Sequence, residues 1–568
     1  SIKLFIKLYT KKMDKKSKLK IGLLIDPSRR LIDWEIKIIH EILFSNFAEI
    51  TCIFYDPADR KIRKSFFEKL IFNFKSNTIY SSILRNFIEF MENKYSNLTR
   101  LDELTIVKKF FSQVEKIQIK CTKKKFDDYF DKDQCDLIRS KNLDILFRRD
   151  FRILKGEILD CAKFGVWSFH HGDNDFFRGM PPGFWECYLN KNITGVTLQK
   201  LTKNLDAGEI IDKGFYATKF YWLLNREFIY EKSVSIFIKN LKLLYNNQRL
   251  DTRPSNTSKV KIYRSPDFLT LLKYILKKYP LALFNKLFIN NFYTRKNKNI
   301  WKLHICKGNI ESRKLNDLVK FQPPDGEYWA DPFVLTFDDK NFVFFENYEF
   351  KNKRSKISTC EITNEKIFKV RDALKLDYHL SYPFVWKENN NFFMMPETAQ
   401  KKRIEIWQAD NFPSSWKLKK ILFEGQSFAD TTFFIDSLGN KWLFTNKSTD
   451  KFDDHNSELY IYKILGDNFE NIEPHKCNPV IIDSKVARNA GKIFYDHDGN
   501  LIRPSQMNIS NIYGYALNIN KIIKLSINEY VEEKLFTIKP GELTGVRGIH
   551  HISQEKNFFI LDACYHKR

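Results

Sequence analysis

A hairpin pattern that returns roughly every 50 to 60 residues dominates the second half of this 568-residue chain. Each unit joins two apolar strands through a tip rich in Asp, Asn, Gly or Lys, as at residues 338–341, 438–440 and 497–500. The units start near residues 331, 381, 430, 489 and 546. Five such units fit a four-stranded blade repeated five times, so we predict an all-β, five-bladed β-propeller over residues 300–568.

Polar residues gather at two places in each unit, the start of the first strand and the end of the second. A propeller hairpin brings these places to the same face of the ring, so we predict that the side chains converge on one mouth. Carboxylates suit sugar chemistry, and arginines suit a phosphate or carboxylate. A polar channel mouth without a ligand is the alternative. The candidate substrate-binding residues are Asp331, Glu346, His379, Glu397, Asp430, Arg488, Arg503, Gln506 and Arg547.

Several motifs in the repeat carry a family resemblance. They include Trp-Ala-Asp-Pro-Phe at 329–333, His-Leu-Ser-Tyr-Pro-Phe at 379–384, Ala-Arg-Asn-Ala-Gly at 487–491 and Arg-Pro-Ser-Gln at 503–506. In these motifs the chain resembles the propeller domain of glucosamine inositolphosphorylceramide transferases, which implies carbohydrate handling, with glycosyl transfer attributed to another domain of those proteins. Residues 330–333 also resemble the first blade of five-bladed glycoside hydrolases, although Ser381 stands near the place of their second-blade aspartate.

The N-terminal part shows a different pattern, in which short apolar runs alternate with a helical period. Runs at 21–25, 50–55 and 143–148 are typical of buried strands, and apolar residues from Asp33 to Leu43 recur on one helical face. We expect another helix to open at 152–159. Strand, helix, strand begins a doubly wound α/β sheet, which we predict over residues 20–220. No glycine-rich phosphate loop follows the first strand, so no dinucleotide site is predicted.

Residues 165–211 of this region cluster polar groups at spacings that core packing does not require. A strand-like run at 165–169 delivers His170 and His171 to the rim of the sheet, and a turn at 205–210 can aim Asp206 back toward them. A histidine and a carboxylate brought together in this way can act as an acid/base pair. A purely structural histidine at a strand end is the alternative.

The same stretch resembles the catalytic core of the 10-formyltetrahydrofolate-dependent formyltransferases. The residues in register are His170, Arg178, Gly179, Trp185, Thr194, Gly195, Val196, Thr197, Asp206 and Gly208. Ser168 stands where the family has asparagine, and His171 where it has proline. The resemblance implies a formyltransferase-like fold, 10-formyltetrahydrofolate as the cofactor, and a catalytic set formed by Ser168, His170 and Asp206.

The resemblance also implies a role for each residue. In the family the asparagine stabilises the oxyanion, the histidine assists that charge, and the aspartate manages the proton of the attacking amine. Loss of an oxyanion donor costs roughly 3 kcal/mol of barrier, so with Ser168 formyl transfer is slowed, redirected or absent. The loop after residues 143–148 would bind the pterin through Arg148, Arg149 and Phe151, unless the two arginines are simply solvated, and the substrate would contact His171, Arg178 and Trp185.

The net charge of +26, from 95 Lys+Arg against 69 Asp+Glu, suits an anionic lipid, a nucleic acid or an acidic substrate such as a nucleotide-sugar. The lysines are scattered along the chain, so no nucleic-acid partner is predicted. Nine cysteines show no CxxC spacing, which indicates neither a metal site nor a disulfide framework and fits a reducing cytoplasm. No run of 18 apolar residues is present.

Two further segments complete the predicted organisation. Residues 1–19 form a basic leader, and residues 221–299 form a helical linker between the domains. Within the linker, residues 268–292 interleave apolar side chains with lysines. Such a segment can lie on the anionic inner face of a membrane or form a helix pair packed between the domains.

We therefore expect an N-formyltransferase that acts on an amino sugar, either nucleotide-linked or within a glycan, in cell-surface polysaccharide biosynthesis. One alternative places glycosyl transfer or hydrolysis of an anionic glycan in the propeller. Another is a non-catalytic glycan-binding protein whose formyltransferase domain has lost its chemistry. The sequence predicts neither the sugar nor the oligomeric state.

Overall fold

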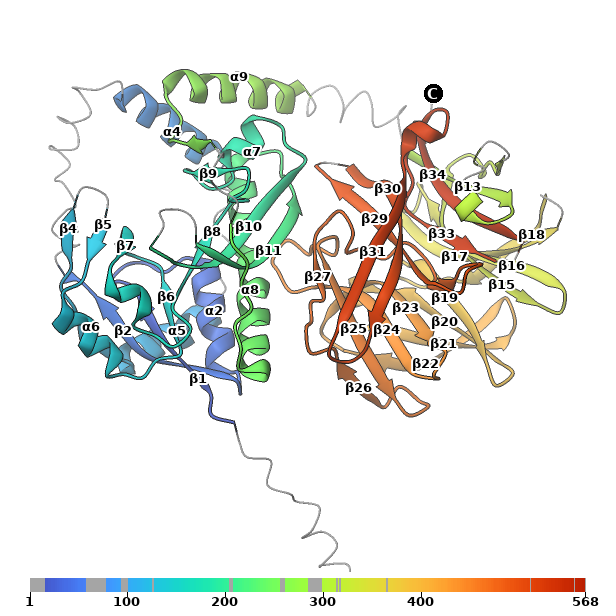
Figure 1. Cartoon of the computed structure of the whole chain (residues 1–568). Helices are drawn as coiled ribbons and strands as arrows, with labels where there is room; N and C mark the ends of the chain where they lie inside the picture. Colours follow the sequence, from blue (N-terminus) through green and yellow to red (C-terminus); the bar gives the residue numbers. More distant parts are fainter. Residues whose placement is uncertain are drawn as a thin grey trace, which may run out of the picture.

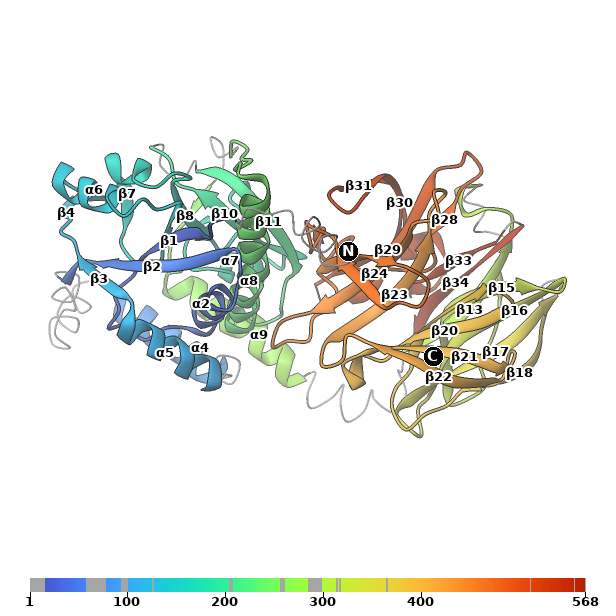
Figure 2. The same ribbon diagram turned by 90° about the horizontal axis from the view of Figure 1, so that it is seen from below.

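The structure is a computed structural model of the chain (Figure 1). It describes residues 16–57, 78–92, 101–124, 127–203, 208–255, 261–284, 299–312, 315, 318–363, 366–510, 512–555 and 557–566. Most of the predicted basic leader, Asp206, and the linker residues 256–260 and 285–298 lie outside this part of the chain. An α/β domain stands on one side of the molecule and an all-β domain on the other, as Figure 2 shows from below.

The α/β domain is built on a seven-stranded sheet in the order β11-β10-β8-β6-β1-β2-β3. Strands β3, β2, β1, β6 and β8 run parallel, whereas β10 runs antiparallel to β8 and β11. The bounds are β1 (Leu19–Leu24), β2 (Ala48–Tyr55), β3 (Glu115–Gln118), β6 (Ile145–Arg148), β8 (Val166–His170), β10 (Ile193–Lys200) and β11 (Glu209–Ala217).

Helices cover both faces of this sheet, as a doubly wound fold requires. On one face α2 (Asp33–Leu43), α5 (Leu101–Gln113) and α8 (Trp222–Asn247) bury a core that includes Trp34, Ile38 and Phe237. On the other face α6 (Lys132–Arg139) packs over Leu146 and Val166. The prediction of a doubly wound α/β domain is confirmed.

The prediction that a helix opens at residues 152–159 is wrong. The segment forms β7 (Ile153–Lys155) and a 3₁₀ turn (Glu157–Asp160) instead. Gly156 lies between them at φ +83°, a left-handed conformation that no α-helix accepts. Arg152 is held by Asp128, which draws β7 beside β5 (Asp127–Tyr129) in a small sheet with β4 (Thr122–Lys124).

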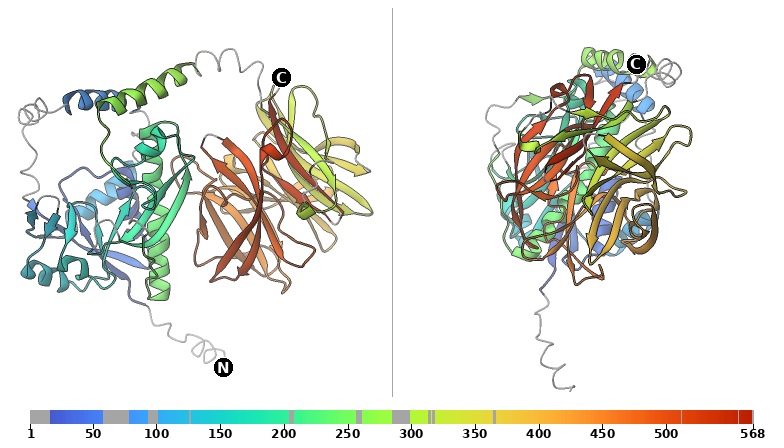
Figure 3. Two further views of the ribbon diagram at one scale, coloured as in Figure 1. Left: turned by 45° about the horizontal axis from the view of Figure 1, so that its top comes forward. Right: turned by 90° about the vertical axis from the view of Figure 1, so that its right-hand side faces the viewer.

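Two helices form a layer at one end of the α/β domain, α4 (Thr78–Glu92) and α9 (Phe268–Phe284) (Figures 1 and 3). They pack against each other and, through Ile88, Leu271 and Tyr274, against α7 (Phe184–Tyr188) and the start of α8. The buried carboxylate of Glu92 accepts hydrogen bonds from the Tyr274 and Tyr279 hydroxyls. Within the described residues, no helix combines the length and apolar character needed to cross a bilayer.

The all-β domain contains five sheets arranged as blades, which confirms the predicted propeller. The first three are β15 (Glu327–Phe337) to β18 (Lys366–Leu374), β19 (Ser381–Glu388) to β22 (Ser415–Leu422), and β23 (Ser427–Ile435) to β26 (Asn471–Pro474), with β27 (Ile481–Ile482) on β25. The fourth is β28 (Phe494–Tyr495), β29 (Leu501–Ile509), β30 (Ile512–Leu525) and β31 (Tyr530–Ile538). The second and third strands of the first three blades are β16 (Lys340–Glu349), β17 (Arg354–Thr363), β20 (Asn391–Glu397), β21 (Ile404–Asn411), β24 (Lys441–Ser448) and β25 (Glu458–Leu465).

The fifth blade joins the two ends of the propeller. Strand β13 (Asn299–Lys307) pairs along its whole length with β34 (Phe558–His566). Strands β14 (Val319–Lys320), β32 (Val546–Gly548) and β33 (Ile552–Gln554) complete the sheet. Because the first and last strands share one blade, the ring closes without exposing a sheet edge between them.

One residue from each blade meets at the propeller axis: Phe333, Tyr382, Thr432, Gly491 and His551. The Tyr382 hydroxyl accepts from the Gly491 N–H (2.9 Å) and lies 3.0 Å from the Thr432 hydroxyl. The Phe333 and Tyr382 rings pack edge-on against the His551 ring. All five side chains or backbones are buried, so this layer separates the two mouths of the propeller.

Helix α8 lies between the two domains and carries much of their contact (Figure 1). The ammonium group of Lys232, 1% exposed, pairs with Asp450 (2.6 Å), Asp454 (2.9 Å) and Glu458 (3.4 Å) of the third blade. Lys451 of the propeller reaches back to Asp33 at the start of α2 (3.0 Å). Buried charges of this kind are costly to leave unpaired, so the domains dock in one specific arrangement.

Candidate functional site

The innermost strands of the first three blades each contain a bulge at their start. Asp331, Tyr382 and Asp430 lie in the left-handed region, at φ +51°, +45° and +48°. The strand register shifts at each of these places. A left-handed conformation is unfavourable for residues with a side chain, and here the repeated bulge turns Asp331 and Asp430 toward the same mouth.

Asp430 is the centre of a buried charged cluster at that mouth. The Arg488 guanidinium binds its carboxylate through Nε (2.6 Å) and Nη2 (3.2 Å), and the Gln506 amide donates a third hydrogen bond (3.0 Å). Burial alone would raise the pKa of Asp430, but the Arg488 charge and hydrogen bonds lower it below its ordinary value. Asp430 is therefore a carboxylate.

Glu397 lies next to Asp430 and behaves in the opposite way. Burial raises the pKa of Glu397 well above its ordinary value, and the negative charge of Asp430 adds to the effect. Arg488 is 3.5 Å from Glu397 but is bound more closely by Asp430. The neutral form of Glu397 is therefore favoured beside the Asp430 carboxylate. Neighbouring carboxyl groups held in different protonation states can act as acid and base.

Asp331 lies beside a second buried charge. The His550 imidazole contacts Asp562 through Nδ1 (2.7 Å) and lies 3.7 Å from Asp331 through Nε2, while Trp301 stacks on its other face at 4.0 Å. Burial opposes charging of the ring, but Asp562 and Asp331 outweigh it and raise the pKa of His550 to about 9. The three ligand atoms lie within 4.8 Å of one another, yet with a protonated ring the imidazolium itself is the cation.

Two predicted residues lie at the edge of this cluster. Glu346 accepts a hydrogen bond from the Tyr328 hydroxyl (3.2 Å) and another from Ser355. The partly exposed His379 approaches Glu346 at 3.7 Å. The structure thus brings Asp331, Glu346, His379, Glu397, Asp430, Arg488 and Gln506 to one mouth.

Two predicted arginines contact residues outside this cluster. Arg503, fully buried, pairs with Glu532 on β31 (2.7 Å) and donates to the Val486 carbonyl. Arg547 is exposed and contacts His566 (3.3 Å). The expectation that Arg503 lines the mouth is wrong, because its guanidinium is held by Glu532 on β31, whereas the expectation for Arg547 stays a prediction. The sequence interpretation missed His550 and the supporting Tyr513, whose ring lies 5.0 Å from the Arg488 guanidinium.

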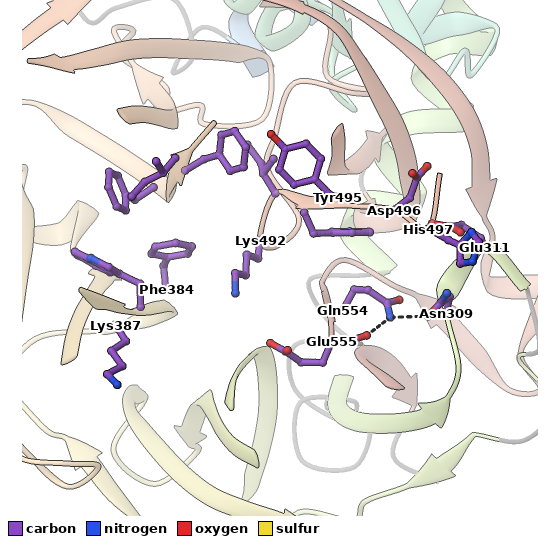
Figure 4. A pocket seen from close by; sticks show the side chains of 16 residues that line it. Asn309, Glu311, Phe384, Lys387, Lys492, Tyr495, Asp496, His497, Gln554 and Glu555 are labelled. Atoms are coloured by element: carbon purple, nitrogen blue, oxygen red, sulfur yellow. Dashed lines mark hydrogen bonds between the residues drawn. The ribbon is translucent and has the colours of Figure 1, made fainter. Parts of the chain in front are cut away.

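The opposite mouth of the propeller holds a cavity of about 580 Å³ (Figure 4). Its walls come from the far ends of the innermost strands and combine aromatic side chains, among them Phe384, Trp386, Phe433 and Phe494, with many charged and polar ones. Figure 4 shows Lys492 and Glu555 extending into the open space between these walls. With both aromatic and polar walls, the cavity has the size of a small-molecule site, although its residues were not among those predicted.

The α/β site is built on the end of β8. Ser168 and His170 are two residues apart and project from the same side of the strand, where they face Gln199 and Thr197 of β10. Ser168 is buried. The His170 Nε2 lies 2.7 Å from the Phe177 carbonyl oxygen, which only a protonated Nε2 can satisfy, so Nδ1 is the nitrogen able to accept a proton in the neutral ring. Asp206 lies outside the described residues, so its meeting with Ser168 and His170 stays a prediction.

His171 points to the other side of the strand and belongs to a packed cluster. Its Nε2 contacts the Ser233 hydroxyl (3.0 Å), and its ring packs on Phe169, Tyr230 and Trp34. Burial lowers the pKa of His171 well below its ordinary value, and the nearby Arg149 charge lowers it further. The ring is therefore neutral and has a structural environment.

The predicted cofactor residues differ in the contacts that they make within the protein. Arg149 binds the buried Glu35 carboxylate (2.5 Å) and lies 4.3 Å from the Trp34 ring. Phe151 adopts φ +68° and packs on Phe130. Arg148 ends β6, at the carboxyl edge of the parallel strands where ligands of such sheets bind.

The predicted substrate residues Arg178 and Trp185 flank a short two-stranded contact. Arg178 belongs to β9 (Arg178–Gly179), which pairs with β12 (Ile262–Tyr263). The Trp185 indole donates to the carbonyls of Met180 (3.1 Å) and Arg264 (3.2 Å). These contacts tie the segment after His170 to the strand that precedes α9.

Two polar groups near His170 were missed. Asn174 is buried, its Oδ1 lies 3.4 Å from the Thr197 hydroxyl, and its amide nitrogen has no partner among the described residues. Lys213 bridges Asp173 (2.6 Å) and Asp175 (2.5 Å). Residues 173–175, Asp-Asn-Asp, directly follow the predicted His-His-Gly sequence. This run of polar side chains beside His170 was the signal in the sequence that could have identified them.

A basic cavity of about 700 Å³ opens between the β1–α2 loop and α5. Leu31, Ile36 and Phe111 form apolar walls, and its basic residues are Arg29, Arg30, Lys108 and Lys116. Arg29 also binds Glu35 and Asp150. The cavity lies beyond the carboxyl end of β1 and suits an anionic ligand with an apolar part.

Comparisons with known proteins agree with this division. Residues 317–543 match the family model described as glucosamine inositolphosphorylceramide transferase 1, N-terminal. The rice (Oryza sativa subsp. japonica) protein named glucosamine inositolphosphorylceramide transferase 1 is 34% identical over 221 residues, which are 37% of this chain. The chain spans only 29% of the length of that relative.

The N-terminal part is similar to other proteins. The bifunctional polymyxin resistance protein ArnA of Wigglesworthia glossinidia brevipalpis is 29% identical over 163 residues, 27% of this chain and 24% of its own. A methionyl-tRNA formyltransferase of Prochlorococcus marinus (strain AS9601) is 35% identical over 60 residues, 11% of this chain and 18% of its own.

Among solved structures, an endo-arabinase from Bacteroides thetaiotaomicron is 15% identical, with 42% of this chain and 93% of that chain covered at a TM-score of 0.32.

The chain thus joins a formyltransferase-like α/β domain to a five-bladed propeller that matches the N-terminal domain of glucosamine inositolphosphorylceramide transferase 1.

Proposed function

We propose that this protein is a transferase that N-formylates an amino sugar at the carboxyl end of β8, while the propeller binds the glycan or nucleotide that carries the sugar. The observation that carries the proposal is the position of His170, at the rim of the sheet with Nε2 fixed by the Phe177 carbonyl (2.7 Å) and Ser168 on the same side of the strand. The similarity to a methionyl-tRNA formyltransferase lies in the same domain.

The residues near His170 fit a folate cofactor in one specific respect. The buried Asn174 amide nitrogen lacks a partner among the described residues, and an acceptor oxygen would satisfy it. Arg148 and the basic cavity beside Arg29 would hold anionic groups. When bound, 10-formyltetrahydrofolate supplies the formyl group.

The chain's own residues then supply positioning and proton handling. His170 stabilises charge on the formyl oxygen, and Ser168 can donate one hydrogen bond where the resembling enzymes have an amide. Asp206 is proposed to take the proton of the attacking amine. Because one oxyanion donor contributes roughly 3 kcal/mol, a second donor such as Asn174 would offset the exchange of asparagine for serine.

A formylation assay tests this proposal. The full chain is incubated with 10-formyltetrahydrofolate and a panel of nucleotide-linked amino sugars, and mass spectrometry detects the formamide. We expect His170→Ala to lower the rate by about 100-fold or more, whereas His40→Ala, in the last turn of α2, leaves it unchanged. Ser168→Asn should raise the rate. No product with any member of the panel, or equal rates for wild type and His170→Ala, would contradict the proposal.

The propeller cluster favours a second candidate, cleavage or transfer of a glycosidic bond. The observation is the gathering of the Asp331, Glu397 and Asp430 carboxyl groups at one mouth beside Arg488, since carboxyl groups supply both the acid and the base or nucleophile of such chemistry. Release of sugar from a glycan panel by the wild type, lost in Glu397→Gln, would support this activity. Unchanged release in that variant would place the activity outside this cluster.

We further propose that the protein works in the cytoplasm. Reduced folate is the expected cofactor, and all nine cysteines are free thiols. Fractionation of cells that express the full chain tests this location, and recovery outside the cytoplasm and its membrane face would contradict it.

A further inference from the structure

The layer formed by α4 and α9 exposes an unusual number of large apolar side chains. On α4 they are Tyr80, Ile83, Phe87, Phe90 and Met91, with exposed fractions from 42% to 79%. Their spacing of three, four, three and one residues places them on one stripe of the helix. Leu269 and Leu276 of α9, both 62% exposed, are seven residues apart and therefore share a face of that helix.

The apolar surface continues beyond the helices. Phe176 (68%), Met180 (58%) and Ile262 (53%) are exposed in the β9–β12 contact that leads into α9. The Met180 N–H donates to the Tyr263 carbonyl (3.1 Å), and the Phe177 ring stacks on Tyr263. These residues and the helix stripes together form one region, which we call the apolar face. Scattered exposed apolar residues are ordinary, but a concentration of this kind marks an interaction site.

Basic residues border the apolar face. Lys261, Arg264, Lys273 and Lys277 are all exposed, against the exposed acidic residues Glu89 and Asp267. Apolar burial and attraction to anionic lipid add together on such a surface. Because no helix among the described residues can cross a bilayer, the association that this surface supports is peripheral.

We propose that the apolar face docks on an anionic phospholipid membrane. The aromatic rings of Tyr80, Phe87 and Phe90 would enter the membrane–water interface, while Lys273 and Lys277 would contact the lipid headgroups. The charge complementarity, together with the chain's net charge of +26, favours this occupant over a protein partner.

Docking in this way would bring the α/β site to the membrane surface. His170 contacts the Phe177 carbonyl, Phe177 stacks on Tyr263, and Tyr263 is five residues before α9. The amino-sugar acceptor would then be attached to a lipid, an extension that rests on the formyltransferase function proposed above. The membrane docking itself does not depend on that function.

Vesicle flotation of the full chain tests the proposal. We expect the wild type to float with phosphatidylglycerol-containing vesicles and less with pure phosphatidylcholine, and to be released by salt. The double variant Phe90→Ser/Leu276→Ser should lower the partition coefficient about tenfold or more, since both side chains would leave the bilayer. Lys273→Glu/Lys277→Glu should remove the preference for anionic lipid. Phe44→Ser, at a 69% exposed phenylalanine after α2, is the matched control and should bind as the wild type does.

Failure of the wild type to float, or equal flotation by the wild type and the Phe90→Ser/Leu276→Ser variant, would overturn the proposal. Self-association or binding of another protein that this variant abolishes, without vesicle binding, would assign the face to a protein partner and overturn it too. The formylation assay on a nucleotide-linked sugar reports on the catalytic proposal separately. If membrane docking is confirmed, equal rates on lipid-linked and nucleotide-linked acceptors would refute only the lipid-linked substrate.

Discussion

The chain contains the dipeptide His-His twice, once in each domain, and the two copies have different chemistry. In the α/β domain His170 contacts a backbone carbonyl and His171 a serine hydroxyl, and desolvation and the Arg149 charge lower the pKa of His171, which keeps its ring neutral. In the propeller His550 contacts the Asp562 carboxylate (2.7 Å) and lies 3.7 Å from the Asp331 carboxyl group, and its pKa is raised to about 9, whereas burial lowers the pKa of His551 to about 3.

The difference shows that the residues brought near each ring, not the dipeptide, decide its charge. The α/β site is made from one continuous stretch, and its polar groups mostly hydrogen-bond to that stretch and the neighbouring strand. The propeller mouth is made from blades far apart in the sequence, and its groups pair as buried charges. We therefore expect electrostatic changes to affect the propeller more than the α/β domain.

The largest expected effect is on the propeller's paired charges. Arg488→Met leaves Asp430 buried without its cation, which should lower the free energy of unfolding of the propeller by roughly 3 to 5 kcal/mol. Hydrogen exchange resolved by domain measures this change, because a two-domain chain need not unfold in one step. Arg371→Met, which removes a half-exposed partner 3.7 Å from Glu361, should change it by about 1 kcal/mol or less. Similar losses in both variants would contradict the distinction between the mouth and the surface.

Alkaline pH should destabilise the propeller through His550. Its pKa is raised from 6.5 to about 9, so its stabilisation is fully present below pH 6.5 and is lost as the pH rises through 9. The shift corresponds to roughly 3 kcal/mol. Stability of the propeller measured from pH 6.5 to 9.5 should fall in the wild type, and the slope should flatten in His550→Gln. A wild-type propeller of constant stability over this window would show that His550 is neutral.

Acid pH should instead destabilise the α/β domain through His171. Its folded pKa is depressed because the fold disfavours the charged ring, so the unfolded state binds the proton first and stability is lost as the pH falls below 6.5. One proton allows at most about 1.4 kcal/mol per pH unit. Hydrogen exchange of α2 and α8 between pH 6.5 and 5.5 should show this loss, with a weaker pH dependence in His171→Gln. The same slope in both proteins would assign the loss to other groups.

The smallest effect on stability is expected for Glu397→Gln. Because burial beside Asp430 raises the pKa of Glu397 and favours its neutral form, the amide preserves its shape and charge, and the free energy of unfolding should change by less than about 1 kcal/mol. Any glycosidic activity of the propeller should nevertheless be lost with the transferable proton. A large loss of stability in this variant would mean that Glu397 is ionised in the folded protein.

The sequence predicted the outlines of both domains for different reasons. Alternating apolar runs and a five-fold hairpin repeat are local patterns, so the doubly wound sheet and the propeller followed from them. The helix expected at 152–159 failed because its end depends on Gly156 and on the distant Asp128. The propeller mouth was predicted for Asp331, Glu397, Asp430 and Arg488, since their places in the repeat determine the face on which they lie.

By itself, then, the sequence determined the architecture and placed His170 at a strand end and the carboxylates at one mouth. Only the tertiary structure decided which groups are charged. Arg503 pairs with Glu532 on β31 instead of lining the mouth. The pKa values of Glu397 and Asp430 shift in opposite directions because Arg488 lies 2.6 Å from Asp430 but 3.5 Å from Glu397. Charge in a buried site depends on desolvation and on neighbours within a few ångströms, and those neighbours come from segments that no local pattern connects.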